Sequence, residues 1–330
     1  MRSNTERLRR FNSRFAPGSN VLVIINADPD AIASALAVKR LLWRKVNRLE
    51  ITYFNEITRP DNLAMIHLVE PKMVPLKDLD PQPFDRFVVV DSQPDHNEAF
   101  ERFEYDVIID HHPVTSDNAE YTDIRPDCGA CSTIMVDYLK AARITPSRRL
   151  AAALLLGIKT DTADFTRQAG LKDVKAFQYL YKFASINLVT KVERAMVTEK
   201  DLDFIAKAIK SRTVAKGRLF SHAGRVDNSD EIVIAADFFL GVAGVNWSIV
   251  SGIFNKNLVI VIRNDGLRKS AGKAAAEAFG KFGSAGGHKT MARAEIPMGV
   301  VKKEAGSGSK ESVATWIVSR VDKKAGKKTD

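Results

Sequence analysis

A repeated pattern in the first half of the chain constrains the fold more than any other feature of the sequence: short β-branched apolar runs alternate with stretches of helical periodicity. The runs predicted as strands cover residues 21–25, 50–53, 86–90 and 106–109. A helical pattern begins at Ile32, and further helices are predicted over residues 63–68, 132–142 and 147–159. Short buried strands that alternate with helices are typical of a doubly wound, mainly parallel sheet. We therefore predict an α/β fold for this half of the chain.

The second half of the chain predicts a different and smaller domain. A chain of 330 residues exceeds the size at which a single core usually stops growing, so two domains are expected. We predict a first domain over residues 1–190, a helical connector over residues 191–213 and a smaller α+β domain over residues 214–330, with a cleft between the two domains. Within the second domain the predicted strands are residues 217–225, 231–236 and 258–262, the predicted helices are 242–254 and 271–279, and residues 280–288 form a glycine-rich loop.

The composition favours a soluble protein that meets anionic partners. Fifty Lys and Arg against forty Asp and Glu give a net charge of +10, which attracts polyanions such as nucleic acid, nucleotides or polyphosphate. No run reaches the ~18 apolar residues of a membrane helix, and residues 1–15 are Arg-rich without an apolar signal core. We therefore expect a cytoplasmic protein without a membrane span.

Metal-capable side chains occur at four places that the pattern assigns to the ends of strands at one sheet edge. They are Asp28 with Asp30, Asp91, Asp110 with His111 and His112, and Asp161. A single aspartate of this kind is more ordinary as a turn residue, but four groups at one edge create a charge that needs cations. Carboxylates with imidazole suit Mn²⁺, and a two-metal site could promote an in-line phosphoryl displacement. Structural or exposed roles are expected for His67, His96, Asp106 and His222.

Five motifs, taken in order along the chain, resemble the DHH phosphoesterase superfamily in its branch with a DHH-associated C-terminal domain. The motifs are DPDAIAS at residues 28–34, VVVD at 88–91, IDHHP at 109–113, GIKTDT at 157–162 and GGH at 286–288. The resemblance implies that residues 1–190 are the metal-binding phosphoesterase domain and residues 214–330 the substrate-binding domain. It also implies that Asp91 bridges two Mn²⁺ ions, with Asp30, His111 and Asp161 on one ion and Asp28 on the other. His112 would act with Asp91 in catalysis, close to the phosphate.

One position departs from the family pattern where it matters. The family carries a metal-binding histidine four residues before its first motif aspartate, and this chain has Ile24 there. Isoleucine has no lone pair, so the ion on Asp28 and Asp91 loses a ligand unless water or Asn26 replaces it. We therefore expect one or two Mn²⁺ ions, with Mg²⁺ as an alternative, and the ion near His111 to bind more tightly.

The resemblance implies that the glycine-rich segment and Arg263 hold the far end of the substrate. Backbone N–H groups at Gly286, Gly287 and His288 can approach an anion closely, and an arginine can pair with phosphate oxygens. Arg293 is a looser candidate for the same role. The resemblance points to short oligonucleotides of the nanoRNA class, to adenosine 3′,5′-bisphosphate (pAp) or to linear dinucleotides. A basic stripe interleaved with aromatic residues is lacking, which disfavours processive degradation of long strands.

The leading functional prediction is a Mn²⁺-dependent phosphoesterase, an exonuclease-like hydrolase that cleaves a small nucleotide with metal-activated water. A catalytically weak nucleotide-binding or sensing protein is the alternative that Ile24 favours. A polyphosphate or pyrophosphate hydrolase would keep the metal chemistry with another substrate. The sequence leaves the oligomeric state open, and a homodimer is compatible with it.

Overall fold

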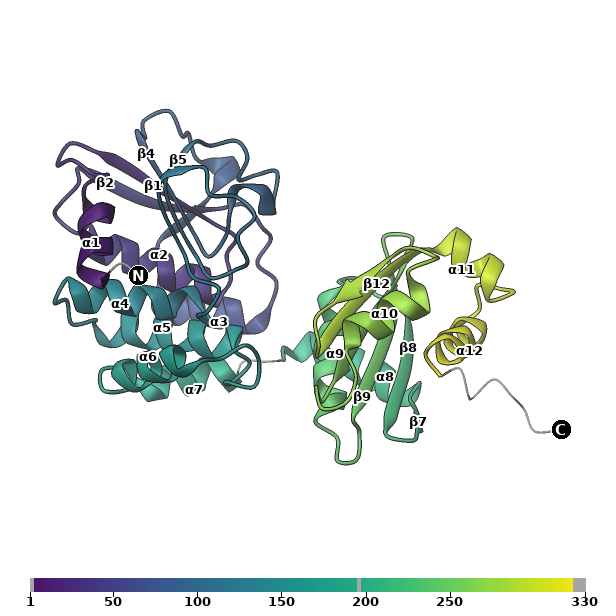
Figure 1. Cartoon of the computed structure of the whole chain (residues 1–330). Coiled ribbons are helices and arrows are strands. Elements are labelled where there is room, and N and C mark those ends of the chain that lie inside the picture. Colours follow the sequence, from purple (N-terminus) through teal and green to yellow (C-terminus); the bar gives the residue numbers. More distant parts are fainter. Residues whose placement is uncertain (1–2, 195–196, 323–330) are drawn as a thin grey trace. The chain divides into compact units, whose positions relative to one another are not determined.

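The computed structural model describes residues 3–194 and 197–322 and divides the chain into two compact units, Met1–Met196 and Val197–Asp330 (Figure 1). Each unit has its own six-stranded sheet and its own hydrophobic cores. The units are therefore described one at a time. In the residues that the structure describes, no helix is long and apolar enough to cross a membrane.

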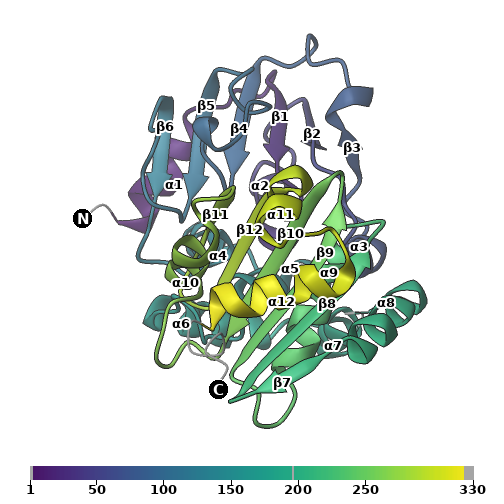
Figure 2. The same ribbon diagram turned by 90° about the vertical axis from the view of Figure 1, so that its right-hand side faces the viewer.

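The sheet of the first unit is entirely parallel and has the strand order β3-β2-β1-β4-β5-β6 (Figure 2). Its strands are β1 (Asn20–Ile25), β2 (Arg48–Tyr53), β3 (Met73–Pro75), β4 (Arg86–Val90), β5 (Tyr105–Asp110) and β6 (Ala119–Ile124). The chain moves outward from β1 to β3 and then returns to the other side of β1 to form β4. This order confirms the predicted doubly wound, parallel α/β architecture. The switch point lies between β1 and β4, where such sheets usually bind ligands.

The two faces of this sheet are covered differently. The helices are α1 (Asn4–Asn12), α2 (Pro29–Leu41), α3 (Pro60–Val69), α4 (Cys131–Ala141), α5 (Arg148–Asp161), α6 (Leu171–Tyr181) and α7 (Ile186–Arg194). They bury their apolar residues in one large core with Val21, Val23 and Ile25 of β1. The opposite face carries Leu22 and Ile24, which pack against phenylalanines of the connecting segments. These segments include the short 3-10 helices η1 (Leu76–Asp78) and η2 (Pro94–His96).

The second unit is a mixed sheet with helices on both faces. Its strand order is β11-β12-β10-β9-β8-β7, and only β8 and β9 pair in parallel. The strands are β7 (Thr213–Ala215), β8 (Arg218–Arg225), β9 (Trp247–Phe254), β10 (Asn257–Asn264), β11 (Ser284–Gly287) and β12 (Met291–Pro297). The helices α8 (Glu199–Lys210) and α9 (Asp230–Leu240) pack on one face, and α10 (Ala271–Phe279), α11 (Met298–Glu304) and α12 (Lys310–Val321) pack on the other. This agrees with the predicted smaller α+β domain.

The residues predicted as a connector, 191–213, contain a helix that belongs to the core of the second unit. Phe204, Ile205 and Ala208 of α8 are buried against residues of α9 and of the sheet. A helix with an apolar stripe gains stability by burying it, so α8 packs instead of bridging the units through solvent.

Three predictions in the second unit are wrong in secondary structure. Residues 231–236 form part of α9 and not a strand, because Ile232, Ala235, Ala236 and Phe239 recur at helical spacing and are all buried. Residues 242–254, predicted as a helix, contain β9, whose Ile249 and Val250 enter the cores on opposite faces of the sheet. The predicted loop at residues 280–288 contains the edge strand β11.

Gly157 of α5 packs closely against Ser132 and Asp30, and this packing generates a test. A Cβ atom at residue 157 would lie 2.5 Å from Ser132 Oγ and 2.7 Å from Asp30 Oδ1. We predict that Gly157→Ala lowers the free energy of unfolding by about 1–3 kcal/mol, because overpacking outweighs the gain in helix propensity. Gly299→Ala in α11, where a Cβ would meet nothing within 4 Å, is the matched control and should be neutral or stabilising. Urea denaturation measures both, and equal effects would contradict the packing argument.

Candidate functional site

The switch point of the first unit gathers the acidic residues that the sequence singled out. Asp28 and Asp30 begin α2 directly after β1, and Asp91 follows β4, the neighbour of β1. Asp110 ends β5, and His111 and His112 follow it. The prediction that Asp161 follows a strand is wrong, because it is the last residue of α5. The cluster is thus built from three neighbouring strands and one helix terminus.

Four side chains converge closely enough to share a cation. One ligand atom from each of Asp30, Asp91, His111 and Asp161 lies within 4.8 Å of all the others. The Nε2 atom of His111 is 3.0 Å from Asp161 Oδ2 and 3.2 Å from Asp91 Oδ1. This set is the one that the family resemblance assigns to a single ion. A second set of Asp91, Asp110, His111 and His112 satisfies the same distance criterion and shares two residues with the first.

Two buried atoms of the first set suit a divalent cation. Within the described part of the chain, Asp91 Oδ1 and His111 Nε2 have no hydrogen bond of acceptable geometry, although they lie at ion-pair distance from each other. Buried polar atoms without aligned partners are costly, and a cation between them would satisfy both. Carboxylate oxygens and an imidazole nitrogen are ligands that Mn²⁺ accepts. The residues present therefore fit a divalent metal ion.

The electrostatics of the cluster show how strongly its negative charges repel one another. Burial, together with the charge of Asp161, raises the pKa of Asp28 to about 7 and the pKa of Asp30 to about 6. Burial and the charges of Asp30 and Asp28 raise the pKa of Asp91 well above its ordinary value. Burial disfavours a charged His111 ring, but its contacts with Asp161 and Asp91 outweigh that effect and raise its pKa to about 12. Protons thus occupy the cluster, and a cation must displace them.

Asp30 is held rigidly by the beginning of α4. Its two carboxylate oxygens accept hydrogen bonds from the backbone N–H of Cys131 at 2.6 Å and of Ser132 at 2.8 Å. These N–H groups would otherwise lack partners at a helix N-terminus, where negative charge is also favoured. Each oxygen keeps a second lone pair with which it can face a cation.

Asp28 lies outside both four-residue sets. Its carboxylate accepts a hydrogen bond from the N–H of Ala31 at 2.9 Å and caps α2. Ile24, which stands in place of the family histidine, is fully buried among Phe84, Phe100 and other apolar residues. The ligand set for a second ion is therefore much less complete than the set around His111.

Asp110, the first residue of the sequence motif, positions the two histidines. Its Oδ1 accepts hydrogen bonds from the backbone N–H of His111 and from Nδ1 of His112, both at 2.8 Å. Its Oδ2 accepts a hydrogen bond from Nε2 of Gln93 at 2.6 Å. Burial alone would raise the pKa of Asp110, but the hydrogen bonds with His112 and Gln93 outweigh it and lower that pKa. Because Nδ1 is held, the half-exposed His112 ring has Nε2 available for a ligand.

Gln93 is a site residue that the sequence analysis missed. Its side chain is completely buried, and its Oε1 accepts hydrogen bonds from the backbone N–H groups of Thr115 at 2.8 Å and Ser116 at 2.9 Å. Gln93 thus ties the segment after His112 to Asp110. In the sequence, Gln93 is marked only by its place two positions after Asp91, and polar residues are too common in loops for this to identify it. His96, expected to be structural or exposed, lies edge-on to His112 with ring centroids 5.5 Å apart.

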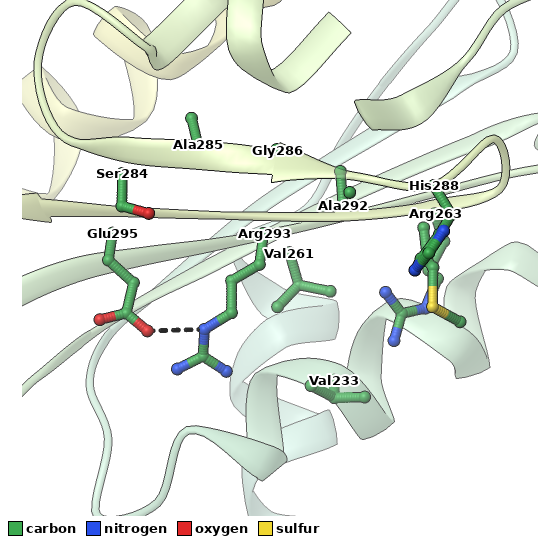
Figure 3. A pocket seen from close by; sticks show the side chains of 12 residues that line it. Val233, Val261, Arg263, Ser284, Ala285, Gly286, His288, Ala292, Arg293 and Glu295 are labelled. Carbon is green, nitrogen blue, oxygen red and sulfur yellow. Dashed lines mark hydrogen bonds and ion pairs between the residues drawn. The ribbon is translucent and has the colours of Figure 1, made fainter. Parts of the chain in front are cut away.

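The second unit contains a cavity lined by the predicted substrate-binding residues. Arg263, Gly286, Gly287 and His288 border a cavity of about 710 Å³, and the looser candidate Arg293 lines it too (Figure 3). Nε of Arg263 donates a hydrogen bond to Asp237 Oδ1 at 2.6 Å. A second guanidinium nitrogen donates a long hydrogen bond of 3.5 Å to the carbonyl oxygen of Ile262, so part of the group is engaged by the protein.

Gly286 and Gly287, which both line this cavity, differ in the space around them and in backbone conformation. Gly287 has φ +145°, and a Cβ atom there would lie 2.4 Å from the carbonyl oxygen of Met291. Gly286 has open space around its Cβ position, so its lack of a side chain keeps the cavity wide. The fold therefore requires glycine at position 287 but not at position 286.

The comparison with known families decides the assignment of the first unit. Residues 20–158 match the family described as "DHH family, N-terminal domain". This chain carries a DHH family domain. The DHH domain covers every predicted metal ligand except Asp161, which follows the matched segment.

Two curated relatives share part of their length with this chain. Uncharacterized protein MJ1633 of Methanocaldococcus jannaschii is 36% identical over 283 residues, which cover 86% of this chain and 58% of the relative. The A-adding tRNA nucleotidyltransferase of Aquifex aeolicus is 27% identical over 159 residues, or 43% of this chain and 19% of that protein. The chain thus spans little more than half the length of the first relative.

Solved structures share the fold of this chain. An exopolyphosphatase-related protein from Bacteroides fragilis superposes with a TM-score of 0.71 at 15% identity, covering 96% of this chain and 98% of that chain. The exonuclease RecJ bound to manganese gives a TM-score of 0.51 at 13% identity, covering 96% of this chain and 95% of that chain. At these identities the likeness concerns the fold alone.

Because protons occupy the metal-binding set, we predict that Mn²⁺ affinity falls as the pH is lowered from 8 to 5. Asp30 of this set takes up a proton as the pH passes below about 6, its neighbour Asp28 outside the set does so below about 7, and His111 holds its proton throughout this range. Each displaced proton weakens binding about tenfold per pH unit. Titration calorimetry in buffers of different ionisation enthalpy measures both affinity and proton release. Asp203→Asn, at an exposed position of α8, is the control, and binding that is independent of pH would contradict the prediction.

The buried Gln93 amide generates a second test. Gln93→Leu removes the donor to Asp110 and leaves the N–H groups of Thr115 and Ser116 without their acceptor. We expect a loss of about 1–3 kcal/mol in the free energy of unfolding, because buried polar groups lose their partners. The exposed Gln82→Leu should change it by less than about 0.5 kcal/mol. Similar urea midpoints for the two variants would show that the Gln93 contacts contribute little.

Proposed function

We propose that this protein is a divalent-cation-dependent phosphoesterase that hydrolyses a phosphate ester in a small nucleotide. The convergence of Asp30, Asp91, His111 and Asp161, with two buried atoms that lack aligned partners, is the observation that carries the proposal. Mn²⁺ is the proposed ion, and Mg²⁺ is the alternative. A short oligonucleotide, pAp or a linear dinucleotide is the proposed substrate, supported by the two arginines in the cavity of the second unit.

The proposed chemistry divides the work between the bound ion and the side chains. A divalent cation held by the four residues supplies the positive charge that polarises a phosphoryl oxygen and makes a water molecule more acidic. Asp91 is fixed by its left-handed backbone, with φ +59°, and by the hydrogen bond from its N–H to the carbonyl of Ile109 at 2.9 Å. Asp110 holds Nδ1 of His112, so Nε2 of the neutral ring would accept a proton from the attacking water, and the ring charged in that way could then donate this proton to the leaving oxygen.

Ile24 supports a second candidate function, a nucleotide-binding or sensing protein with weak turnover. The isoleucine is buried in an apolar cluster and offers no ligand near Asp28. If the reaction needs a second ion, its weak binding would leave a protein that holds a nucleotide and hydrolyses it poorly. A protein of this kind would still bind a nucleotide in the cavity and a cation at the set around His111. It would differ from the proposed phosphoesterase only in its rate of hydrolysis.

Hydrolysis of pAp, a dinucleotide and pyrophosphate with Mn²⁺ tests the proposal. We expect wild type to hydrolyse a nucleotide substrate faster than pyrophosphate, and Asp91→Asn to lower the rate at least about a hundredfold because it removes a shared ligand. Asp203→Asn should retain the wild-type rate. Turnover by Asp91→Asn at the wild-type rate would contradict the proposed site. An inactive wild type that gains turnover through Ile24→His would favour the sensing function.

A further inference from the structure

One face of the second sheet brings a distinct set of side chains into the cavity. Arg293 of β12 pairs with Val261 of β10 on one side and with Gly286 of β11 on the other. Glu295 lies opposite Ser284, one row further along. Directly paired residues share a face of the sheet, and residues two apart on a strand share it too. Helix α9 packs on β9 and β10, whereas α10 packs on β11 and β12 from the opposite face, where Ala292, Ala294 and Ile296 are buried.

The cavity has two chemically different ends (Figure 3). Arg263 and His288 lie at one end, where Arg263 pairs with Met291 in the sheet. Glu295 and Ser284 lie at the other end, four residues along β12 from Met291, which corresponds to about 13 Å at ~3.3 Å per residue. Arg293 stands between the ends. The cavity is therefore long enough to separate the recognition of a phosphate from the recognition of a base.

The middle of the cavity suits a flat ring. Val261 and Val233 supply apolar surface, and Gly286 has open space where a side chain would stand. Arg293 can present its guanidinium plane, which stacks readily on aromatic rings, or its N–H donors. These surfaces favour a nucleobase over a chain of phosphates.

Glu295 places a carboxylate in a cavity that is also lined by Arg263 and Arg293. Its Oε1 accepts a hydrogen bond from Nε of Arg293 at 2.7 Å, and about 40% of each of the two side chains is exposed. The carboxylate would repel a second phosphate group at this end. It would accept hydrogen bonds from N–H donors of a neutral group, which points to the edge of a base.

We propose that Arg293 and Glu295 select guanine, so that the cavity prefers guanosine nucleotides. The Watson–Crick edge of guanine carries the acceptor O6 beside two N–H donors, which match an arginine donor beside a carboxylate that can accept twice. Adenine offers one amino donor on that edge, so it leaves part of the pair unsatisfied. This inference deepens the proposed function and rests on it for the nucleotide nature of the ligand.

Direct binding to the full-length protein tests the guanine assignment without any turnover. Calorimetric titrations with GMP, AMP and inorganic phosphate, in the presence of EDTA, measure the three affinities. We expect GMP to bind at least about tenfold more tightly than AMP, because a matched pair of hydrogen bonds discriminates between bases by about this factor. Equal affinities for GMP and AMP would overturn the assignment.

A matched pair of variants separates the role of Glu295 from general effects of charge. Glu295→Gln preserves the side-chain size and should reduce the ratio of GMP to AMP affinity to within about threefold of unity, whereas Glu304→Gln at an exposed position of α11 should preserve the wild-type ratio. An unchanged ratio in Glu295→Gln would overturn the role of this carboxylate. Thermal melting of both variants confirms that they fold.

The test of guanine selectivity and the test of hydrolysis can fail independently of each other. Selective GMP binding by a protein that hydrolyses no nucleotide would support the guanine assignment and overturn the hydrolytic function. Hydrolysis without a preference for GMP would overturn the guanine assignment and leave the hydrolytic function standing.

Discussion

The repulsion among buried carboxylates at the switch point is the constraint on which the rest of the first unit depends. Asp30 and Asp91 are buried beside the partly buried Asp161, and the positive His111 ring between them offsets only part of their charge. Such a cluster is tolerated when its members are held by donors and share protons or a cation. The N–H groups at the start of α4 hold Asp30, and Gly157 of α5 leaves it room.

A second layer of contacts converts this cluster into an oriented site. Asp110 accepts hydrogen bonds from the backbone N–H of His111, from the His112 ring and from Gln93, so one buried carboxylate fixes the His111 backbone and the direction of the His112 imidazole. The His111 ring is held by Asp91 and Asp161. The arrangement follows a general rule for metal sites, in which the partners of the ligands fix the ligand geometry. In the second unit, Arg263 lies at the end of the cavity proposed to bind phosphate, and the pair of Arg293 and Glu295 lies toward the end proposed to bind the base. The proposed chemistry and the proposed recognition therefore rest on different sheets.

The sequence predicted the parallel sheet and the convergence of most of the acidic residues at one sheet edge, because short apolar runs that end in aspartate mark both features. The strand before Asp91 and the helix over residues 271–279 have the predicted bounds, since their apolar patterns are unambiguous. Residues 231–236 were wrongly predicted as a strand, because their β-branched residues favour strands. The apolar spacing that indicates a helix becomes clear only when the segment is followed to Phe239. Gln93 and Glu295 could not be found, because their contacts join segments that are distant in the sequence. Gln93 bonds to Asp110 and to residues 115–116, and Glu295 pairs with Ser284 in the sheet.

The central claim is that Asp30, Asp91, His111 and Asp161 form one divalent-cation site of higher affinity than any site at Asp28. Anomalous scattering at the manganese edge, from crystals equilibrated with a low concentration of Mn²⁺, locates bound ions directly. The account predicts one strong peak among these four side chains, with a weaker peak beside Asp28 only at higher concentration. A first peak beside Asp28, or strong Mn²⁺ binding elsewhere with none among the four residues, would contradict it.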